Sequence, residues 1–288
     1  MARRLDRLSA LLDRFALRAE VIFVGPLTRP STMSARGPLG VVHYLEAGSA
    51  RLDIPGVPVR EIAGPAILFV PRGDAHTLSP DEPVRRQKLV CATIDFGGAE
   101  SNPILSALPH AIVVPVDRAL GNPLESTVEL LISEAFAARC GSQTVISRAF
   151  EILIVQVLRH LMATTQIKVG LLAGLSDLRL ARALAAIHES PESHWSVERL
   201  ARAAGMSRTA FAVRFREIVG ATPANYLSAW RVAIAKTQLA RGRTLKVIAA
   251  EVGFQSSAAL SRAMRRKSES RRTRSRASKP SSETAARS

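Results

Sequence analysis

The sequence is poor in cysteine and contains no long hydrophobic run. Its 288 residues include two cysteines, Cys91 and Cys140, which are too few for a disulfide framework. Both have apolar neighbours, so we expect buried thiols in a reducing compartment and prefer this to a redox pair. The absence of any run of about 18 apolar residues argues against a membrane-spanning helix. The basic N-terminus lacks the apolar core of a signal peptide, so we expect a cytoplasmic protein.

Acidic residues are also scarce, and their shortage is confined to one part of the chain. There are 40 Lys and Arg against 24 Asp and Glu, a net charge of +16. Up to Leu175 the counts are 18 and 16, whereas from Ser176 onward they are 22 and 8. A solubilising tail explains part of this excess, because residues 262–288 carry +8, but residues 176–261 keep +6. The charge therefore predicts a nucleic-acid-binding module in the last third of the chain.

One sequence pattern occurs twice in that basic region. The first copy starts at Ser196 and reads SVERLARAAGMSRTAFAVRFREIVG; the second starts at Thr244 and reads TLKVIAAEVGFQSSAALSRAMRRK. Each copy has a short amphipathic helix with a central alanine, then a glycine, then a second helix. Glycine permits a turn with positive φ, and alanine lets two helices cross closely. The residues concerned are Ala201 and Gly205 in the first copy and Ala249 and Gly253 in the second. The pattern predicts two helix-turn-helix units.

The second helix of each copy has one apolar face and one face free to contact DNA. A helical wheel buries Phe211, Phe215 and Ile218 in the first copy, and Leu260 and Met264 in the second. The opposite faces carry arginine, serine, threonine, alanine and valine, which suit base edges in a major groove better than plain solvent. The predicted DNA-binding residues are Arg208, Thr209, Ala212, Val213 and Arg216 in the first copy, and Ser257, Ala258, Ser261, Arg262 and Arg265 in the second.

The segment ATPANYLSAWRVAIAKTQLARGR between the two copies predicts a connecting helix. Thr222 and Pro223 suit its start, and Gly242 suits its end. Roughly 20 residues at 1.5 Å rise span about 30 Å, which is close to one turn of DNA. A connector of this length would let the two units enter successive major grooves. Its apolar stripe consists of Tyr226, Trp230 and Ile234.

Residues 20–95 predict a small antiparallel sandwich or barrel. Five short runs rich in β-branched residues alternate with turn residues: VIFVGPL, GVVHYLEAG, ARLDIPG, AILFVP and KLVCATIDF. The segment GPAILFVPRGDAH resembles the second cupin motif, with Pro71, Gly73 and His76 in matching places. We interpret His43 and His76 as barrel-wall or turn residues that could contact an effector, in preference to metal ligands. No catalytic residue, metal or cofactor is predicted.

Helical periodicity replaces the strand pattern at residues 123–165. The stripe formed by Ile146, Phe150, Leu153, Val157 and Leu161 is broad enough to be covered by the barrel or by a second subunit. Residues 5–15 also have helical spacing and predict an amphipathic helix. The segment TTQIKVGLLAGLSD indicates a hinge near residue 170, followed by a helix capped by Ser176.

Residues 176–267 resemble the DNA-binding domain of the AraC/XylS family of bacterial transcription regulators, and residues 1–165 resemble the cupin-type effector domain that often precedes it. The resemblance implies a multidomain α+β protein, with a cupin-like β-barrel plus helices followed by an all-α domain. We place the effector and dimerisation domain at 1–169, the DNA-binding domain at 170–267 and a basic disordered tail at 268–288. The implied partners are double-stranded promoter DNA, an unknown small-molecule effector, a second copy of the chain and RNA polymerase.

The sequence departs from this family after Lys267. The family continues with a proline-containing stretch and a last short helix, whereas the tail here has no apolar residue larger than alanine or proline. Two alternatives to a regulator modulated by an effector stay open. One is an impaired regulator with a defective second helix-turn-helix. The other is a cupin metalloenzyme fused to a DNA-binding domain, which would need a cage of three or four metal ligands.

Overall fold

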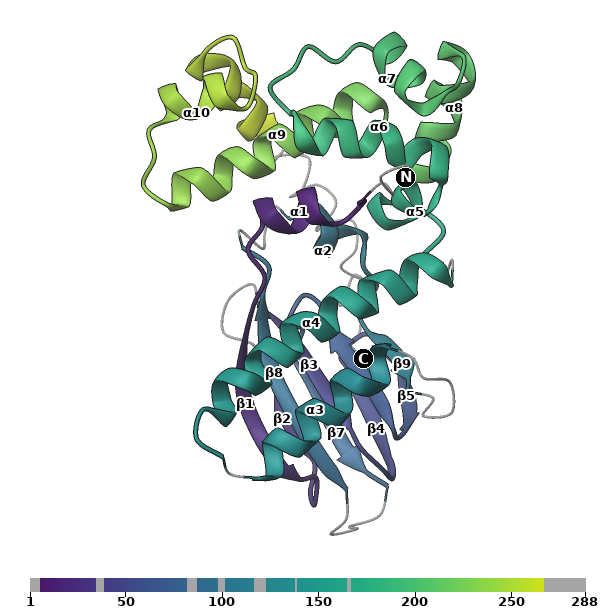
Figure 1. Cartoon of the computed structure of the whole chain (residues 1–288), viewed down its shortest axis with the longest axis vertical. Coiled ribbons are helices and arrows are strands. Elements are labelled where there is room, and N and C mark those ends of the chain that lie inside the picture. The colour runs from purple at the N-terminus through teal and green to yellow at the C-terminus, as the bar shows by residue number, and fades with distance from the viewer. Residues whose placement is uncertain are drawn as a thin grey trace, which may run out of the picture.

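A β-rich part and a helical part make up the chain (Figure 1). The computed structural model describes residues 6–34, 39–81, 87–97, 102–116, 123–137, 139–164 and 167–266. The order of strands and then helices agrees with the predicted α+β architecture. Over these ranges, no helix combines the length and hydrophobicity that crossing a membrane requires.

The β-rich part consists of two antiparallel sheets. The first has the order β1 (Arg18–Pro26), β8 (Lys88–Asp95), β3 (Gly40–Leu45), β6 (Ala66–Val70) and β9 (Ile112–Pro115). The second has the order β2 (Ser31–Met33), β7 (His76–Pro80), β4 (Ser49–Ile54) and β5 (Val57–Ala63). The five predicted runs correspond to β1, β3, β4, β6 and β8, so the predicted sandwich is confirmed. Of the other four strands, β2, β5 and β7 are short or largely polar, whereas β9 is an apolar run, IVVP, that lies beyond residues 20–95, for which strands are predicted.

Buried residues lie on both sides of the first sheet. All residues of β3 and β6 are buried. One face packs against the second sheet, with Leu52, Leu68 and Leu78 between them. The other face packs against helices, and Figure 1 shows α3 (Pro123–Ala137) and α4 (Ser142–Ala163) lying across it. The predicted apolar stripe of α4 is buried there, so the barrel, rather than a second subunit, covers this face.

Helices form the C-terminal part. Their bounds are α5 (Leu171–Ser176), α6 (Leu178–Glu189), α7 (Val197–Ala204), α8 (Arg208–Val219), α9 (Pro223–Ala240), α10 (Leu245–Glu251) and a last helix at 257–266. A short helix, α2 (Pro103–Ala107), links the β-rich part to α5.

The N-terminal helix α1 (Ser9–Arg14) lies against this C-terminal part. It is shorter than the predicted 5–15 and packs on α6. The Arg7 guanidinium donates a hydrogen bond to the Leu175 carbonyl oxygen at 2.8 Å. The ring of Phe15, fully buried, meets the ring of Trp230 edge-on, with 5.4 Å between centroids. The predicted amphipathic helix is thus confirmed within the described residues, and it contacts α9.

The predicted hinge is wrong. Residues 171–176 form the buried helix α5, because Gly174 allows it to approach α6 and α8 closely: a Cβ atom there would lie 2.8 Å from both Leu184 and Val219. Ser176 ends α5 and does not cap the next helix. The cap is Asp177, whose carboxylate accepts hydrogen bonds from the backbone N–H groups of Arg179 and Leu180.

The prediction for the cysteines is half right. Cys91 is buried in β8, and burial raises the pKa of its thiol. Cys140 is exposed. It lies in the turn between α3 and α4, where Phe136, Ala137 and Arg139 before it and Gly141 after it are exposed as well.

Candidate nucleic-acid interface and effector cavity

The first unit, residues 196–219, consists of α7, a glycine turn and α8. Ser196 caps α7 by accepting from the backbone N–H of Arg199 at 3.2 Å, and Ser207 caps α8 by accepting from that of Ala210 at 3.4 Å. Gly205 has φ +64°, the left-handed conformation expected from the sequence. Ala201 is buried at the crossing of the two helices. The local geometry is therefore that of a helix-turn-helix.

Helix α8 buries one side and exposes the other, as the helical wheel predicts. The rings of Phe211 and Phe215 are fully buried with centroids 5.4 Å apart, and Phe215 meets the Tyr226 ring edge-on. Ile218 is half-buried and Val219 completes the stripe. The five predicted DNA-binding residues of α8 point away from this core: Arg208, Thr209, Val213 and Arg216 are exposed, and Ala212 is half-buried. Arg208 forms a surface ion pair with Glu198 at 2.9 Å.

The second unit, residues 244–266, repeats this geometry with α10 and the helix 257–266. Gly253 has φ +80°. Ser256 caps the last helix by accepting from the backbone N–H of Ala259 at 3.2 Å. Leu260 is buried as predicted, whereas Met264 is half-buried and Ala263 takes the second core position. Of the predicted DNA-binding residues, Ala258, Arg262 and Arg265 are exposed, and Ser257 and Ser261 are half-buried. Lys267 and the predicted tail at 268–288 lie outside the described residues.

Helix α9 connects the two units as the sequence predicts. Thr222 caps it, Pro223 is in its first turn, and Gly242 follows its end with φ +81°. Its 18 residues span about 27 Å at 1.5 Å per residue. The stripe Tyr226, Trp230 and Ile234 is buried. Figure 1 places the first unit on one side of α9 and the second on the other.

A buried histidine, which the sequence did not indicate, lies under α9. His188 of α6 shares a 2.7 Å hydrogen bond between its Nε2 and the Tyr226 hydroxyl, and its ring lies 4.3 Å from that of Trp230. Burial lowers the pKa of His188 to about 3, so its ring is neutral at neutral pH. A single histidine forms no sequence motif with nearby residues, so the sequence could not have revealed its contact with Tyr226 and Trp230.

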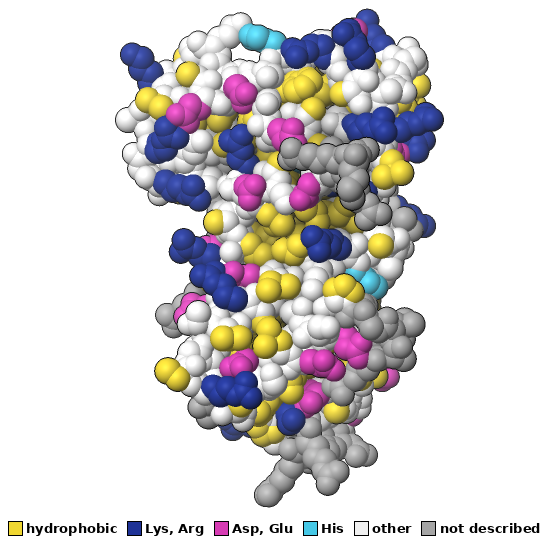
Figure 2. All heavy atoms as spheres, viewed as in Figure 1, with side chains coloured by type: hydrophobic (Ala, Val, Ile, Leu, Met, Phe, Trp, Pro, Cys, Tyr) yellow, Lys and Arg dark blue, Asp and Glu magenta, His cyan; other side chains and the backbone are white. Residues whose placement is uncertain are grey.

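Positive charge gathers on the surface of the helical part. Figure 2 shows more Lys and Arg than Asp and Glu side chains over these helices. The negative charge of Asp177 is partly neutralised, because its carboxylate forms a salt bridge with the guanidinium of Arg214 on α8 at 2.6 Å. Hydrogen bonds from backbone N–H groups and from Arg214 outweigh burial and lower the pKa of the Asp177 carboxyl.

His43 and His76 meet inside the β-rich part, although they are on different sheets. Both are buried, and their Nε2 atoms are 2.8 Å apart. The Nδ1 of His76 is 2.7 Å from the Asp74 carbonyl oxygen, which only accepts, so His76 donates there. A neutral His76 then accepts at Nε2 from His43, and His43 accepts at Nδ1 from the Cys91 thiol at 2.9 Å. Burial lowers the pKa of both histidines, consistent with neutral rings.

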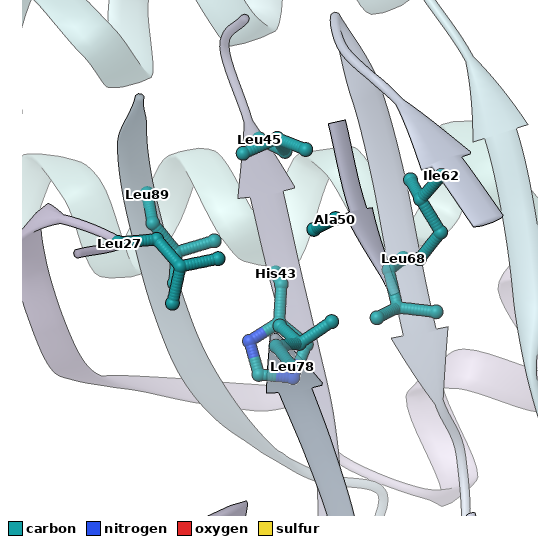
Figure 3. A pocket seen from close by; sticks show the side chains of 8 residues that line it. All are labelled: Leu27, His43, Leu45, Ala50, Ile62, Leu68, Leu78 and Leu89. Atoms are coloured by element: carbon teal, nitrogen blue, oxygen red, sulfur yellow. The ribbon is translucent and has the colours of Figure 1, made fainter. Parts of the chain in front are cut away.

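An apolar cavity adjoins this histidine pair. The cavity is small, with room for about one water molecule between the packed side chains. Figure 3 shows the His43 ring among aliphatic side chains from both sheets. The lining residues are Leu27, His43, Leu45, Ala50, Ile62, Leu68, Leu78 and Leu89. None of these eight described residues is charged at neutral pH, and both ring nitrogens of His43 are already hydrogen-bonded.

Within the described ranges, no three His, Cys, Asp or Glu side chains gather in a way that could hold a metal ion. Cys91 is on the Nδ1 side of His43, whereas His76 is on the Nε2 side, so these three residues do not converge on one point. The metalloenzyme alternative therefore lacks the cage that it needs in this part of the chain.

Two family models match the chain. The model described as Cupin matches residues 6–163, and the model described as Helix-turn-helix domain matches residues 200–273. An AraC-like transcription regulator of Streptomyces lividans is 34% identical over 180 residues, which are 62% of this chain and 59% of that protein. The HTH-type transcriptional regulator AlkR of Acinetobacter baylyi is 28% identical over 263 residues, covering 80% of this chain and 85% of that protein.

The chain spans 59% of the length of the Streptomyces lividans protein, and 54% and 46% of the length of two further curated relatives, from Streptomyces antibioticus and Haemophilus influenzae. Among solved structures, it is similar to fatty-acid-bound ToxT from Vibrio cholerae at 10% identity, with 88% of this chain and 91% of that chain covered and a TM-score of 0.38. The cupin model covers more than half of the chain, a helix-turn-helix model follows it, and the named relatives are regulators of transcription. The chain therefore belongs to the AraC-like transcription regulators that carry an N-terminal cupin domain.

Proposed function

We propose that this protein regulates transcription by binding a specific promoter sequence through both helix-turn-helix units. The observation that carries the proposal is the pair of units with the same turn geometry, joined by a helix of 18 residues. A connector of about 27 Å is compatible with successive major grooves, which are about 34 Å apart along the duplex. The family membership of the chain supports the same function.

The proposed contacts with bases come from the outer faces of α8 and of the helix 257–266. In the first unit they are Arg208, Thr209, Ala212, Val213 and Arg216; in the second they are Ser257, Ala258, Ser261, Arg262 and Arg265. Arginine bridges two acceptors of guanine, and alanine and valine suit the methyl group of thymine. An apolar side chain such as Val213, which is 53% exposed on a helix with a complete core, has no packing role there.

The proposed effector site is the space between the two sheets around the apolar cavity, which the sheets would have to open to admit a molecule larger than water. Its aliphatic lining and the neutral His43 favour an uncharged, mostly apolar small molecule, because a charged group would be desolvated there without a partner. The cavity touches β8, which pairs with β1, and β1 follows directly on α1. A change at the cavity therefore has a short route to α9, through the pairing of β8 with β1, the chain between β1 and α1, and the contact of Phe15 with Trp230. The proposed domains are 1–169 for effector binding and 170–267 for DNA binding.

We propose further that the protein acts as a homodimer through α3 and α4. The outer faces of these helices expose large apolar side chains, and Figure 1 shows both helices on the side of the first sheet that faces away from the second sheet. The residues are Leu130 and Phe136 on α3 and Val145 and Ile152 on α4. Pairing would place four units on one stretch of DNA and increase avidity.

The test of this function is selection from a random DNA library with the full-length protein. We expect an enriched sequence with two conserved elements whose centres are about 10 base pairs apart. A variant carrying Val213→Glu and Arg262→Glu should lose the enriched sequence while keeping its thermal stability, because both side chains are exposed. A library that shows no enrichment, or enrichment that survives both changes, would contradict the proposal.

A further inference from the structure

One arginine of the connecting helix bonds to segments of both helix-turn-helix regions at once. The Nε of Arg231 donates to the Pro191 carbonyl oxygen at 2.7 Å, and its Nη2 donates to that of Ser193 at 2.9 Å. Its Nη1 donates to the Gly253 carbonyl oxygen at 2.9 Å. All three nitrogens of one guanidinium are thus used, and each partner is a backbone atom.

The three carbonyl groups belong to the loop before the first unit and to the turn inside the second unit. A small backbone rotation at either segment would change the orientation of the unit that follows it. Pro191 and Ser193 are in the loop that leads into Ser196, the cap of α7. The Trp195 indole N–H donates to the Ser190 carbonyl oxygen at 2.8 Å and holds the same loop. Gly253 is the turn glycine of the second unit, three residues before Ser256, which caps its DNA-facing helix. The guanidinium therefore links the entry of one unit to the turn of the other.

The two segments are also in direct contact. A Cβ atom on Gly253 would lie 2.6 Å from the Glu192 carbonyl oxygen and 2.8 Å from Nη2 of Arg231. The corresponding glycine of the first unit is open, since a Cβ atom on Gly205 would meet only Arg182, at 4.0 Å. Glycine at 253 is therefore needed for the close approach between units as well as for its own turn.

A planar, pre-organised guanidinium suits this role better than other side chains. Its fork of N–H groups reaches several acceptors with little loss of conformational freedom, whereas a lysine amine acts as a single point. We propose that Arg231 is the positioning residue that fixes the orientation of the second unit relative to the first, and so sets which spacing of DNA elements the protein accepts. This inference rests on the proposed binding of DNA through both units.

A measurement without DNA tests the orientation directly. Spin labels at Glu217→Cys and Arg266→Cys, both exposed positions, in a Cys140→Ser background report the distance between the units by double electron–electron resonance. We expect a single narrow distribution of label-to-label distances when Arg231 is present. The distribution should be clearly broader in Arg231→Met, and its width in Arg231→Lys should be intermediate. Arg243→Met is the matched control, because it also removes one hydrogen-bonded guanidinium, but its partners, Gln238 and Glu251, are outside the loop that leads into the first unit. Equal widths in Arg231→Met and Arg243→Met would overturn the inference.

A second measurement uses DNA and distinguishes this inference from the proposed function. The selected duplex is compared with versions in which one base pair is inserted or deleted between its two elements, which rotates one element by about 35°. The native protein should lose about 100-fold in affinity, since wrong geometry abolishes simultaneous binding. Arg231→Met should bind the best duplex about tenfold more weakly and lose less than about tenfold on the altered ones. An unchanged penalty for altered spacing would overturn the inference, whereas absence of any selected duplex would count against the proposed function alone.

A further pair of variants covers the case in which Arg231→Met does not fold. Gly253→Ala and Gly205→Ala strain their turns alike, because both glycines have positive φ. Only Gly253→Ala also forces the two segments apart. Relaxed spacing preference in Gly253→Ala but not in Gly205→Ala supports the inference, and the same preference in both contradicts it.

Discussion

The two helix-turn-helix units share one sequence pattern but are stabilised by different contacts. In the first unit both helices have serine caps with hydrogen bonds, and two phenylalanine rings fill the core. In the second, Thr244 makes no side-chain hydrogen bond at the start of α10, and the core residues are the smaller Leu260 and Ala263. Arginines supply polar links there: Arg231 reaches Gly253, and Arg243 pairs with Glu251. A shared pattern therefore predicts a shared shape but not a shared source of stability.

The largest expected difference between the units concerns their cores. Phe215→Ala should lower the free energy of unfolding by about 3–5 kcal/mol, because it removes a buried ring that contacts both Phe211 and Tyr226. Leu260→Ala should cost less, about 2–4 kcal/mol. Urea unfolding followed by circular dichroism measures both. The exposed Val213→Ala is the control and should change stability by less than about 0.5 kcal/mol; a Phe215→Ala effect no larger than this would refute the packing comparison.

The next effect concerns DNA contacts. Arg216→Ala in the first unit and Arg265→Ala in the second should each weaken binding to the selected duplex by about 1–3 kcal/mol and relax preference at one base pair. Both arginines are exposed, so the two variants should have the same melting temperature as the native protein. Gel-shift titrations on selected and random DNA provide the measurement. An equal loss on both DNAs would identify the arginine as a phosphate contact, and an effect in only one unit would show that the other does not bind bases.

Low pH should lower the free energy of unfolding, because it favours the protonation of His188, which is buried between α6 and α9. His188 has a pKa of about 3 when folded and about 6.5 when unfolded. The unfolded chain therefore binds this proton first, so its contribution to stability is present above pH 6.5 and is lost as pH falls toward 3. Between pH 7 and 5 the native protein should lose about 1–2 kcal/mol more than His188→Gln. Denaturation followed by fluorescence of Trp195 and Trp230 measures this, and parallel pH profiles would exclude His188 as the cause.

The smallest expected difference concerns the helix caps. Ser207→Ala should destabilise the protein by about 1 kcal/mol, since the Ser207 hydroxyl satisfies the backbone N–H of Ala210. Thr244→Ala should cost only a few tenths, because Thr244 makes no such bond. Thermal unfolding of the two variants, side by side, checks the comparison. Equal costs would mean that Thr244 caps α10 in solution.

Local features were predictable from the sequence, whereas contacts between distant residues were not. The positions of Gly205, Gly253, Thr222 and Pro223 each follow from the backbone conformation required there, and the structure confirms their conformations. The strands β2, β5 and β7 lacked a hydrophobic run, because they are short or carry mostly polar residues, whereas the apolar run of β9, IVVP, was missed.

The meeting of His43 with His76 depends on how two sheets stack, and no spacing along the chain encodes it. The same is true of Arg231, whose sequence position resembles that of any helix-surface arginine. The hinge prediction failed because threonine and glycine suggest flexibility, while Gly174 in fact permits close helix packing. Glycine is thus ambiguous until its neighbours in space are known.

Hydroxyl-radical footprinting of the full-length protein on the selected duplex tests the central claim most directly. Two units joined by α9 predict two protected segments on each strand, one helical turn or about 10 base pairs apart, on the same face of the duplex. Arg216→Ala should weaken protection of one segment and Arg265→Ala that of the other. A single protected segment, or protection that spreads evenly along the DNA, would contradict binding by both units.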